Sequence, residues 1–424
     1  MRKYIFIIRG YNDIDHFIPL LDYLLNKKKS IVYLYSSIHP VRLYPNENLE
    51  YLNKTYNVEV KYLLEGVDKG FVFRKLEFYF YKFIMFFKNK VNTKLIQVIV
   101  NKIGAFGIIS INNSYKKNGD SWAKELISKV NPNAVIYDWT NPVKFPYGSV
   151  TKICKANKIP IIAFPHGMHT NTPDTDPRGM NSLIKKKIID WTDKGLNFDY
   201  FISHGKNETS IRKQLGVDPS TLVELGSLRF SKEWIVKKKK IDHLMSYNDN
   251  LCNGIKLVLF LTKIDYNTNE ISLLNLIKAI LGNKDICLVI KPQTRSMGTT
   301  FLRGFVDKVD IAYNTPSTVL SKWCDIAIVW GSSIGIQVLC ENKDILHPKY
   351  IHSNSSIYEE YLPESIVDSD QHLLSLINKK ITNKDFNIIQ KEHRNNFLKQ
   401  VVYGGSEPNS TNIIHKYDNF LSSL

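Results

Sequence analysis

The residues KYIFIIRGYNDIDHFIPLLDYLLNKKKSIVYLY at positions 3–35 decide the fold, because they predict a strand, a helix and a second strand in succession. Residues 3–8 form a short apolar run of the kind found in buried strands, and residues 30–35 repeat it. Between them, residues 15–26 carry apolar side chains at helical spacing. A strand, a helix and a strand in this order indicate a parallel sheet covered by helices.

The same alternation continues through two parts of the chain. The first part adds expected strands at 58–64, 134–137, 159–164, 200–204 and 222–225, with helices at 49–56 and 143–157. The second part adds strands at 256–261, 286–290, 309–312, 326–329 and 344–346, with helices at 270–281, 315–323 and 334–341. Between these parts, residues 229–253 contain the lysine run 237–240 and a polar stretch, which is typical of a linker.

We therefore predict an α/β protein with two Rossmann-like, doubly wound domains that face each other across a cleft. The N-terminal domain is expected over residues 1–228, the linker over 229–253, and the C-terminal domain with its terminal helices over 254–424. Ligands bind such sheets beyond the carboxyl ends of the strands, near the switch point where the strand order reverses. Side chains directly after predicted strands are therefore the candidate site residues.

The charge of the chain favours anionic partners. Its 424 residues include 57 Lys and Arg against 40 Asp and Glu, a formal net charge of +17. The basic runs are dispersed along the chain, and the sequence contains no recognisable nucleic-acid-binding module, so we expect no nucleic acid as partner. The sequence contains neither a Walker A loop nor a G-x-G-x-x-G pattern, which counts against an ATPase and a classical dinucleotide enzyme.

The sequence predicts a cytoplasmic protein, peripheral at the inner face of the cell membrane. The apolar run at residues 4–8 is too short for a signal segment, and no stretch approaches 18 uncharged apolar residues. The five cysteines are scattered without a C-x-x-C pair, which favours free thiols over a zinc site or a disulfide framework. Residues 71–90 (FVFRKLEFYFYKFIMFFKNK) interleave aromatic and basic residues, which suits a helix at an anionic membrane surface. The alternative is a helix packed between domains.

Two side chains at strand ends of the first domain are candidates for acid–base chemistry. Asp138 follows the expected strand 134–137, and a carboxylate there can act as general base on an acceptor hydroxyl group. The alternative for Asp138 is to cap the following helix. His166, between Pro165 and Gly167, follows the strand 159–164 and suits binding or proton transfer. The alternative for His166 is a loop histidine bonded to backbone.

Two loops of the second domain predict phosphate binding. Small residues between strand 326–329 and helix 334–341 expose backbone N–H groups where phosphate binds; they are Gly331, Ser332 and Ser333. Strand ends at 261 and 290 are followed by cations and an amide that suit a nucleotide; they are Lys263, Lys291, Gln293 and Arg295. An ordinary helix cap and solvated surface charge are the respective alternatives.

We expect no metal site and no resident cofactor. Asp174-Thr175-Asp176 has the D-x-D spacing that some transferases use for a divalent metal, but Pro173 and Pro177 beside it favour a plain turn. A nucleotide-sugar would enter as a substrate.

Taken together, these motifs resemble GT-B glycosyltransferases, and more narrowly bacterial enzymes that build capsule or lipopolysaccharide chains. The resemblance rests on the Pro-His-Gly loop, on Gly226-Ser227-Leu228-Arg229, and on Gly-Ser-Ser before a helix with Gln337 and Glu341. Lys291-Pro292 with Ser332-Ser333 is similar to motifs of Kdo- and sialyl-type transferases, which bind a CMP-activated sugar. Gln293 stands where that family has a histidine.

The resemblance implies a glycosyltransferase that moves a sugar from a nucleotide-sugar to a surface polysaccharide or a lipid-linked glycan acceptor. Its expected partners are the nucleotide-sugar, that acceptor and the anionic inner-membrane surface. Three alternatives remain open: a CDP-polyol phosphotransferase of teichoic-acid type, a nucleotide-sugar 2-epimerase, and a non-enzymatic polyanion-binding protein.

Overall fold

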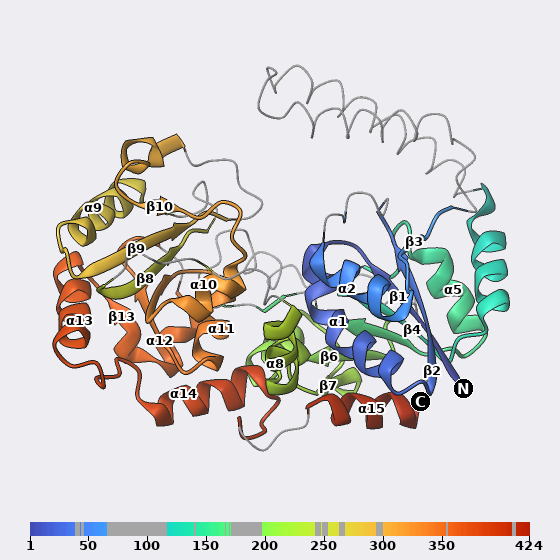
Figure 1. Cartoon of the computed structure of the whole chain (residues 1–424). Coiled ribbons are helices and arrows are strands. Elements are labelled where there is room, and N and C mark those ends of the chain that lie inside the picture. The colour runs from blue at the N-terminus through green and yellow to red at the C-terminus, as the bar shows by residue number, and fades with distance from the viewer. Residues whose placement is uncertain are drawn as a thin grey trace.

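The computed structural model describes residues 1–38, 43, 46–65, 117–139, 141–165, 167, 168, 170, 197–241, 247, 253–262, 268–293, 300–352, 355–408 and 413–424. Within these residues the chain forms two parallel sheets, each flanked by helices (Figure 1). This confirms the predicted α/β architecture of two doubly wound domains. Residues 71–90, the predicted membrane-contacting helix, lie outside the described residues.

The described part of the first sheet has seven strands in the order β3-β2-β1-β4-β5-β6-β7, and all its neighbours run parallel. The strands are β1 (Arg2–Ile8), β2 (Ser30–Ser36), β3 (Lys61–Tyr62), β4 (Ala134–Asp138), β5 (Ile161–Phe164), β6 (Tyr200–Ser203) and β7 (Leu222–Glu224). β1, β2 and β3 step toward one edge, whereas β4 pairs with the other side of β1. The switch point of this sheet therefore lies between the ends of β1 and β4.

β1 shows why the strands of this sheet are apolar at consecutive positions. Tyr4, Phe6 and Ile8 belong to the hydrophobic cluster on one face of the sheet. Ile5 and Ile7 belong to the cluster on the other face. Because successive side chains of a strand point to opposite faces, a sheet covered by helices on both sides needs apolar residues at every position.

The helices of the first domain follow the expected alternation, although their bounds differ. They are α1 (Tyr11–Asn26), α2 (Glu47–Tyr56), α5 (Gly148–Ala156) and α7 (Lys206–Gln214), with the 3-10 turn η4 (Pro219–Thr221); residues 117–130 are also helical. α1 begins four residues before the predicted start at residue 15. The reason is Asp13, whose Oδ2 accepts hydrogen bonds from the backbone N–H groups of Arg9 (2.6 Å) and Gly10 (2.8 Å) and so completes the helix start.

The described part of the second sheet has six strands in the order β10-β9-β8-β11-β12-β13. They are β8 (Ile255–Phe260), β9 (Ile286–Lys291), β10 (Asp310–Ile311), β11 (Ile326–Val329), β12 (Asp344–Pro348) and β13 (Ile366–Val367). Its flanking elements are α9 (Glu270–Leu281), η7 (Thr300–Phe305), α10 (Ser317–Trp323), α11 (Ile334–Cys340), α12 (Ile357–Tyr361), η8 (Pro363–Ser365) and α13 (Asp370–Thr382). The switch point lies between the ends of β8 and β11, in the same relative place as in the first sheet.

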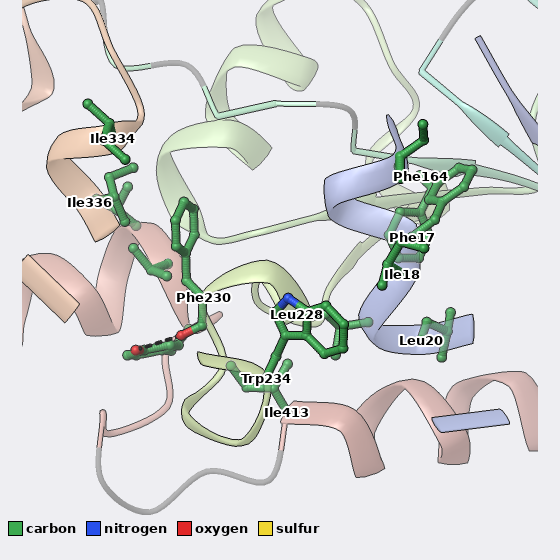
Figure 2. Packing of buried hydrophobic residues seen from close by; sticks show 14 of the residues in the cluster. Phe17, Ile18, Leu20, Phe164, Leu228, Phe230, Trp234, Ile334, Ile336 and Ile413 are labelled. Atoms are coloured by element: carbon green, nitrogen blue, oxygen red, sulfur yellow. Dashed lines mark hydrogen bonds between the residues drawn. The ribbon is translucent and has the colours of Figure 1, made fainter. Parts of the chain in front are cut away.

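The segment expected to be a linker contains the 3-10 turn η5 (Leu228–Phe230) and the helix α8 (Lys232–Ile241), which pack between the two domains (Figure 1). Figure 2 shows Phe230 beside Ile334 and Ile336 of α11, whereas Trp234 lies near Leu20 of α1. These side chains belong to one buried cluster that extends through both domains. The lysine run docks α8 on the first domain, because Lys237 Nζ lies 2.7 Å from both carboxylate oxygens of Asp22.

The C-terminal segment returns to the first domain. It consists of α14 (Lys391–Phe397), the π-helix η9 (Leu398–Val402) and α15 (Ile413–Ser423). Where it crosses the chain near η5, Gly226 and Gly404 have φ values of +89° and +56°, and a Cβ atom on Gly404 would lie 2.9 Å from the backbone N of Gly226. α15 then contacts the first domain, since Tyr417 Oη donates to Gly226 O (2.7 Å) and Arg2 Nη1 donates to Leu421 O (2.9 Å).

The described residues bear on two expectations: whether the cysteines are free thiols, and whether a helix can span a membrane. Cys154, Cys324 and Cys340 are free thiols, as expected, but Cys287 is disulfide-bonded, which corrects the expectation of free thiols throughout. In the ranges that the structure describes, no helix combines the length and the apolar character needed to span a bilayer.

Candidate active site

The switch point of the first sheet holds a compact group of charges. Asp138, the last residue of β4, is fully buried, and its Oδ2 lies 2.8 Å from Nη2 of Arg9, which directly follows β1. Asp13, in the first turn of α1, is also buried and accepts the backbone N–H groups of Arg9 and Gly10. Two carboxyl groups and one guanidinium group thus converge at the carboxyl ends of β1 and β4.

Asp138 is set up to hold a proton near neutral pH. Its burial, followed by the negative charge of Asp13, raises the pKa of Asp138 to about 8, against an ordinary value of 3.8. Arg9 acts in the opposite direction because its positive charge favours the ionised carboxylate. A carboxyl group with a pKa in this range can both give and take a proton at physiological pH.

A second buried network lies at the end of β6. Glu208 of α7 pairs with His204 through Oε2 (2.9 Å to Nδ1) and with Arg212 through Oε1 (2.9 Å to Nη2). Burial alone would raise the pKa of Glu208, but the charges of His204 and Arg212 outweigh it and hold the pKa below its ordinary value. The Arg212 guanidinium stacks on the ring of Trp139, 3.4 Å from its centroid, and Trp139 directly follows Asp138. The network therefore supports the loop that begins at Asp138.

The loop after β5 joins the two domains. His166, predicted as a catalytic residue, lies outside the described residues, as does Asp174-Thr175-Asp176. Thr170 of this loop is described, and its carbonyl oxygen accepts hydrogen bonds from the Ser356 hydroxyl and the Ile357 N–H, both 2.9 Å. Ser356 caps α12, which follows β12 of the second sheet. Loops from the carboxyl ends of both sheets therefore meet here.

The predicted phosphate turn lies at the switch point of the second sheet. Gly331 has φ of +56°, a conformation that favours glycine, and the turn it begins connects β11 to α11. The hydroxyl of Ser332 accepts from the Ile334 N–H (3.4 Å), and Ser333 makes no side-chain cap. All three residues are partly exposed. Their role in phosphate binding stays a prediction, now at the position where a doubly wound sheet binds its ligand.

Lys291 binds two backbone carbonyl groups, which the sequence did not indicate. Its side chain is buried, and its Nζ donates to the carbonyl oxygens of Ala312 and Tyr313, both at 3.0 Å. Burial lowers the pKa of Lys291. The lysine thus ties the end of β9 to the loop after β10, whereas Gln293 beyond it is exposed. Lys263 and Arg295 lie outside the described residues, and nucleotide binding by this loop stays a prediction.

Sequence reasoning missed several members of the first-domain site. They are Arg9, Asp13, His16, His204, Glu208 and Arg212, and the rings of His16 and His204 lie 5.1 Å apart. Arg9 directly follows the predicted strand 3–8, so the criterion that selected Asp138 would have found it. His204 directly follows β6, but the predicted strand 200–204 included it. In the described ranges, no group of three or more His, Cys, Asp or Glu side chains is arranged to hold a metal ion. The expectation of no metal and no resident cofactor stays a prediction.

Comparisons with known proteins define the fold class. No known family model matches the chain, and no curated protein matches its sequence. Among solved structures it is similar to the UDP-GlcNAc 2-epimerase of Neisseria meningitidis bound to UDP-GlcNAc, with 11% identity, a TM-score of 0.53 and 100% of both chains covered. It is also similar to the Methanocaldococcus jannaschii UDP-GlcNAc 2-epimerase in complex with UDP-GlcNAc and UDP (12%, 0.54, 100% of both chains).

A third similar structure is Anabaena HepE in complex with UDP and glucose (10% identity, TM-score 0.54, 100% of both chains). At these identities the likeness concerns the fold alone. It defines the chain as a two-domain α/β protein of the GT-B-like fold, as the sequence predicted.

The same comparisons correct the predicted activity. The sequence predicted a glycosyltransferase of the CMP-sugar type, but five of the similar structures are named UDP-N-acetylglucosamine 2-epimerase in full or in short. Two of these five are described with UDP-GlcNAc bound. The glycosyltransferase prediction is therefore wrong, both as activity and as enzyme class. Its resemblance rested on short motifs at strand ends, and one architecture of this kind can host unrelated activities.

Proposed function

We propose that the chain is a nucleotide-sugar 2-epimerase that binds a UDP-sugar between its two domains. The observation that carries the proposal is Asp138, a buried carboxyl group with a pKa raised to about 8 at the switch point of the first sheet. The similar structures named as UDP-GlcNAc 2-epimerases support it. The diphosphate would lie at the Gly331–Ser333 turn, and the sugar would face Asp138 and Arg9.

The chemistry of 2-epimerisation fits a carboxyl group of this kind. Inverting the configuration at C2 requires that a proton leave one face of C2 and that a proton return to the other face. The first step balances if the C2–H electron pair forms a C1=C2 double bond while the C1–O bond to UDP breaks, and the second step reverses this. A group whose pKa lies near neutrality is present in both protonation states at physiological pH, so it can take part in either step. Arg9 lies beside it with a side chain that is 46% exposed, and a guanidinium group suits pairing with phosphate oxygens. An epimerase needs no acceptor, so the polysaccharide or lipid-linked acceptor has no part here.

The test is turnover of UDP-GlcNAc followed by proton NMR, with formation of its C2 epimer as the readout. Asp138→Asn should lower the rate by about 10²-fold or more, while UDP still raises the melting temperature by mass action. Asp120→Asn is the matched control, because Asp120 is an exposed carboxylate of the same domain that pairs with Lys152. Absence of the epimer with UDP-GlcNAc and other UDP-sugars, or full activity of Asp138→Asn, would contradict the proposal.

Contact with a membrane is a separate proposal that rests on residues 71–90 and on the net charge of +17. The protein should co-sediment with anionic vesicles at low salt and less so as salt screens the charges. Equal, weak binding to neutral and anionic vesicles would contradict it.

A further inference from the structure

The short helix α12 contacts the first-domain side of the candidate site through its first residues. The Ser356 hydroxyl group and the Ile357 N–H both donate to the carbonyl oxygen of Thr170, each at 2.9 Å. Thr170 is buried and belongs to the loop that follows β5 of the first sheet. A carbonyl oxygen has two lone pairs, so these two bonds use its full capacity as an acceptor. α12 therefore fixes the loop after β5 at this residue.

Tyr358 of the same helix contacts the second-domain side of the site. Its Oη donates to the carbonyl oxygen of Ser332 at 3.3 Å, in the middle of the Gly331–Ser333 turn. The Tyr358 ring is fully buried, and its hydroxyl group fills the space beside Gly335, where a Cβ atom would lie 2.6 Å from Tyr358 Oη. Tyr358 thus packs against the turn and against the start of α11. The position of the turn depends on this tyrosine.

Hydrogen bonds and packing hold α12 together as one unit. Ser356 Oγ accepts the Tyr358 N–H (3.3 Å), and Glu359 Oε1 accepts the Ser356 N–H (2.9 Å). Glu359 Oε2 also lies 2.6 Å from Lys349 Nζ, which ties the helix to the residue after β12. The Tyr358 ring packs on Phe397 of α14, with 5.6 Å between centroids. Because closely packed elements shift as units, a change at the turn reaches the contact with the first domain.

We propose that α12 couples the two halves of the site, with Tyr358 and Ser356 as positioning residues. UDP at the Gly331–Ser333 turn fixes the turn, Tyr358 links the turn to α12, and Ser356 holds the loop after β5. This loop leaves the sheet beside Asp138, because Phe164 at the end of β5 pairs with Asp138 at the end of β4. The inference rests on the proposed function, since it takes UDP as the ligand of the turn.

The test is hydrogen–deuterium exchange of the full chain with and without saturating UDP. In the wild type, UDP should slow amide exchange in the segment from β5 to Thr170 as well as in the turn. Tyr358→Phe and Ser356→Ala, each saturated with UDP, should keep the slowing in the turn and lose most of it in that segment. Ser356→Thr, which retains a hydroxyl group, should restore it.

Tyr361→Phe is the matched control, because Tyr361 lies on the same helix and its ring packs on Phe397, with 5.8 Å between centroids. This variant should exchange as the wild type does. Melting temperatures of all variants are measured alongside, so that unfolding is recognised.

Kinetics separate a positioning role from a merely structural one. Ser356→Ala should lower kcat with UDP-GlcNAc by about tenfold or more, because a displaced loop misplaces the reacting groups. Its affinity for UDP, measured by titration calorimetry, should change little, because Ser356 contacts the first-domain loop. Tyr358→Phe should weaken UDP binding by about three- to tenfold, which corresponds to the loss of one neutral hydrogen bond.

Three results would overturn the proposal: exchange from β5 to Thr170 that UDP leaves unchanged in the wild type, slowing there that survives in both Tyr358→Phe and Ser356→Ala, or an equal loss of slowing in Tyr361→Phe. A failure of the proposed epimerase activity is seen separately, because the exchange experiment needs only UDP. The expected exchange pattern without any C2 epimer would contradict the activity and leave the coupling in place.

Discussion

Arg9 Nη2 lies 2.8 Å from Asp138 Oδ2, although the two residues are more than a hundred positions apart in the chain. β1 and β4 pair in parallel, with Ile7 opposite Tyr137, so the residue after β1 and the last residue of β4 meet at the same edge. The buried carboxyl group is thereby linked to a partly exposed guanidinium group.

The stability of the protein should depend on pH through Asp138. Its pKa is raised to about 8 when folded, above the ordinary 3.8, so the folded state binds more protons than the unfolded state between about pH 4 and 8. The contribution of Asp138 is therefore fully present below pH 4 and is lost as pH rises through 8. Across this window, Asp138 makes the free energy of unfolding fall by roughly 1 kcal/mol for each unit by which the pH rises. Urea unfolding at pH 5, 6.5 and 8 should show a shallower decline for Asp138→Asn than for the wild type.

Asp120→Asn provides the control for this prediction. The bond to Lys152 lowers the pKa of Asp120, so this group stays ionised throughout the window. Its variant should decline with pH as the wild type does. Parallel slopes for wild type and Asp138→Asn would place the pKa of Asp138 near its ordinary value.

Arg9→Gln should move the pH dependence of turnover. Arg9 lowers the pKa of Asp138 by favouring the ionised form, so its removal raises that pKa further. The limb of the pH–rate profile that belongs to Asp138 should therefore shift to higher pH in the variant, as measured with UDP-GlcNAc by NMR. Arg2→Gln, which removes an arginine bonded to α15 instead, should leave the limb in place. If the limb of the pH–rate profile does not move in Arg9→Gln, Arg9 does not influence the pKa of Asp138 during turnover.

Glu208→Gln should destabilise the fold by about 3–5 kcal/mol, because it leaves the buried Arg212 without its carboxylate partner. Glu125→Gln, on an exposed face of the helix at residues 117–130, should change the free energy of unfolding by less than about 0.5 kcal/mol. Chemical unfolding of the two variants measures the difference. Near-equal free energies of unfolding for the two variants would show that an uncharged side chain at position 208 is enough to keep the network at the end of β6 stable.

The double variant Ser332→Ala with Ser333→Ala should weaken UDP binding about ten- to hundredfold without lowering the melting temperature substantially, because both side chains are partly exposed.

Lys291→Ala should behave differently from the double serine variant. Its removal leaves the Ala312 and Tyr313 carbonyl groups without their buried donor, so it should lower the melting temperature even without a nucleotide. Titration calorimetry and thermal unfolding separate the two effects. Unchanged UDP affinity in the serine variant would place the diphosphate elsewhere.

The alternation of short apolar runs with helical patterns was enough to predict two parallel α/β domains. It also identified Asp138 as the end of a strand, because the strand 134–137 is apolar at every position and the next residue is charged. Such patterns are local: they arise from the periods of strand and helix side chains, which a sequence displays directly. The residue ranges 1–228, 229–253 and 254–424 for the domains and linker remain predictions, as do the roles of His166, Lys263 and Arg295.

Only the tertiary structure decided which strand ends meet and what each charged side chain contacts. The order of strands brings Arg9 to Asp138, and the packing of α7 turns Glu208 inward to His204 and Arg212. Lys291 looked like a phosphate ligand in the sequence, yet it binds carbonyl groups more than twenty positions away. The physical reason is that burial and charge pairing depend on distances across the fold, and these distances set both the pKa of Asp138 and the partners of its neighbours.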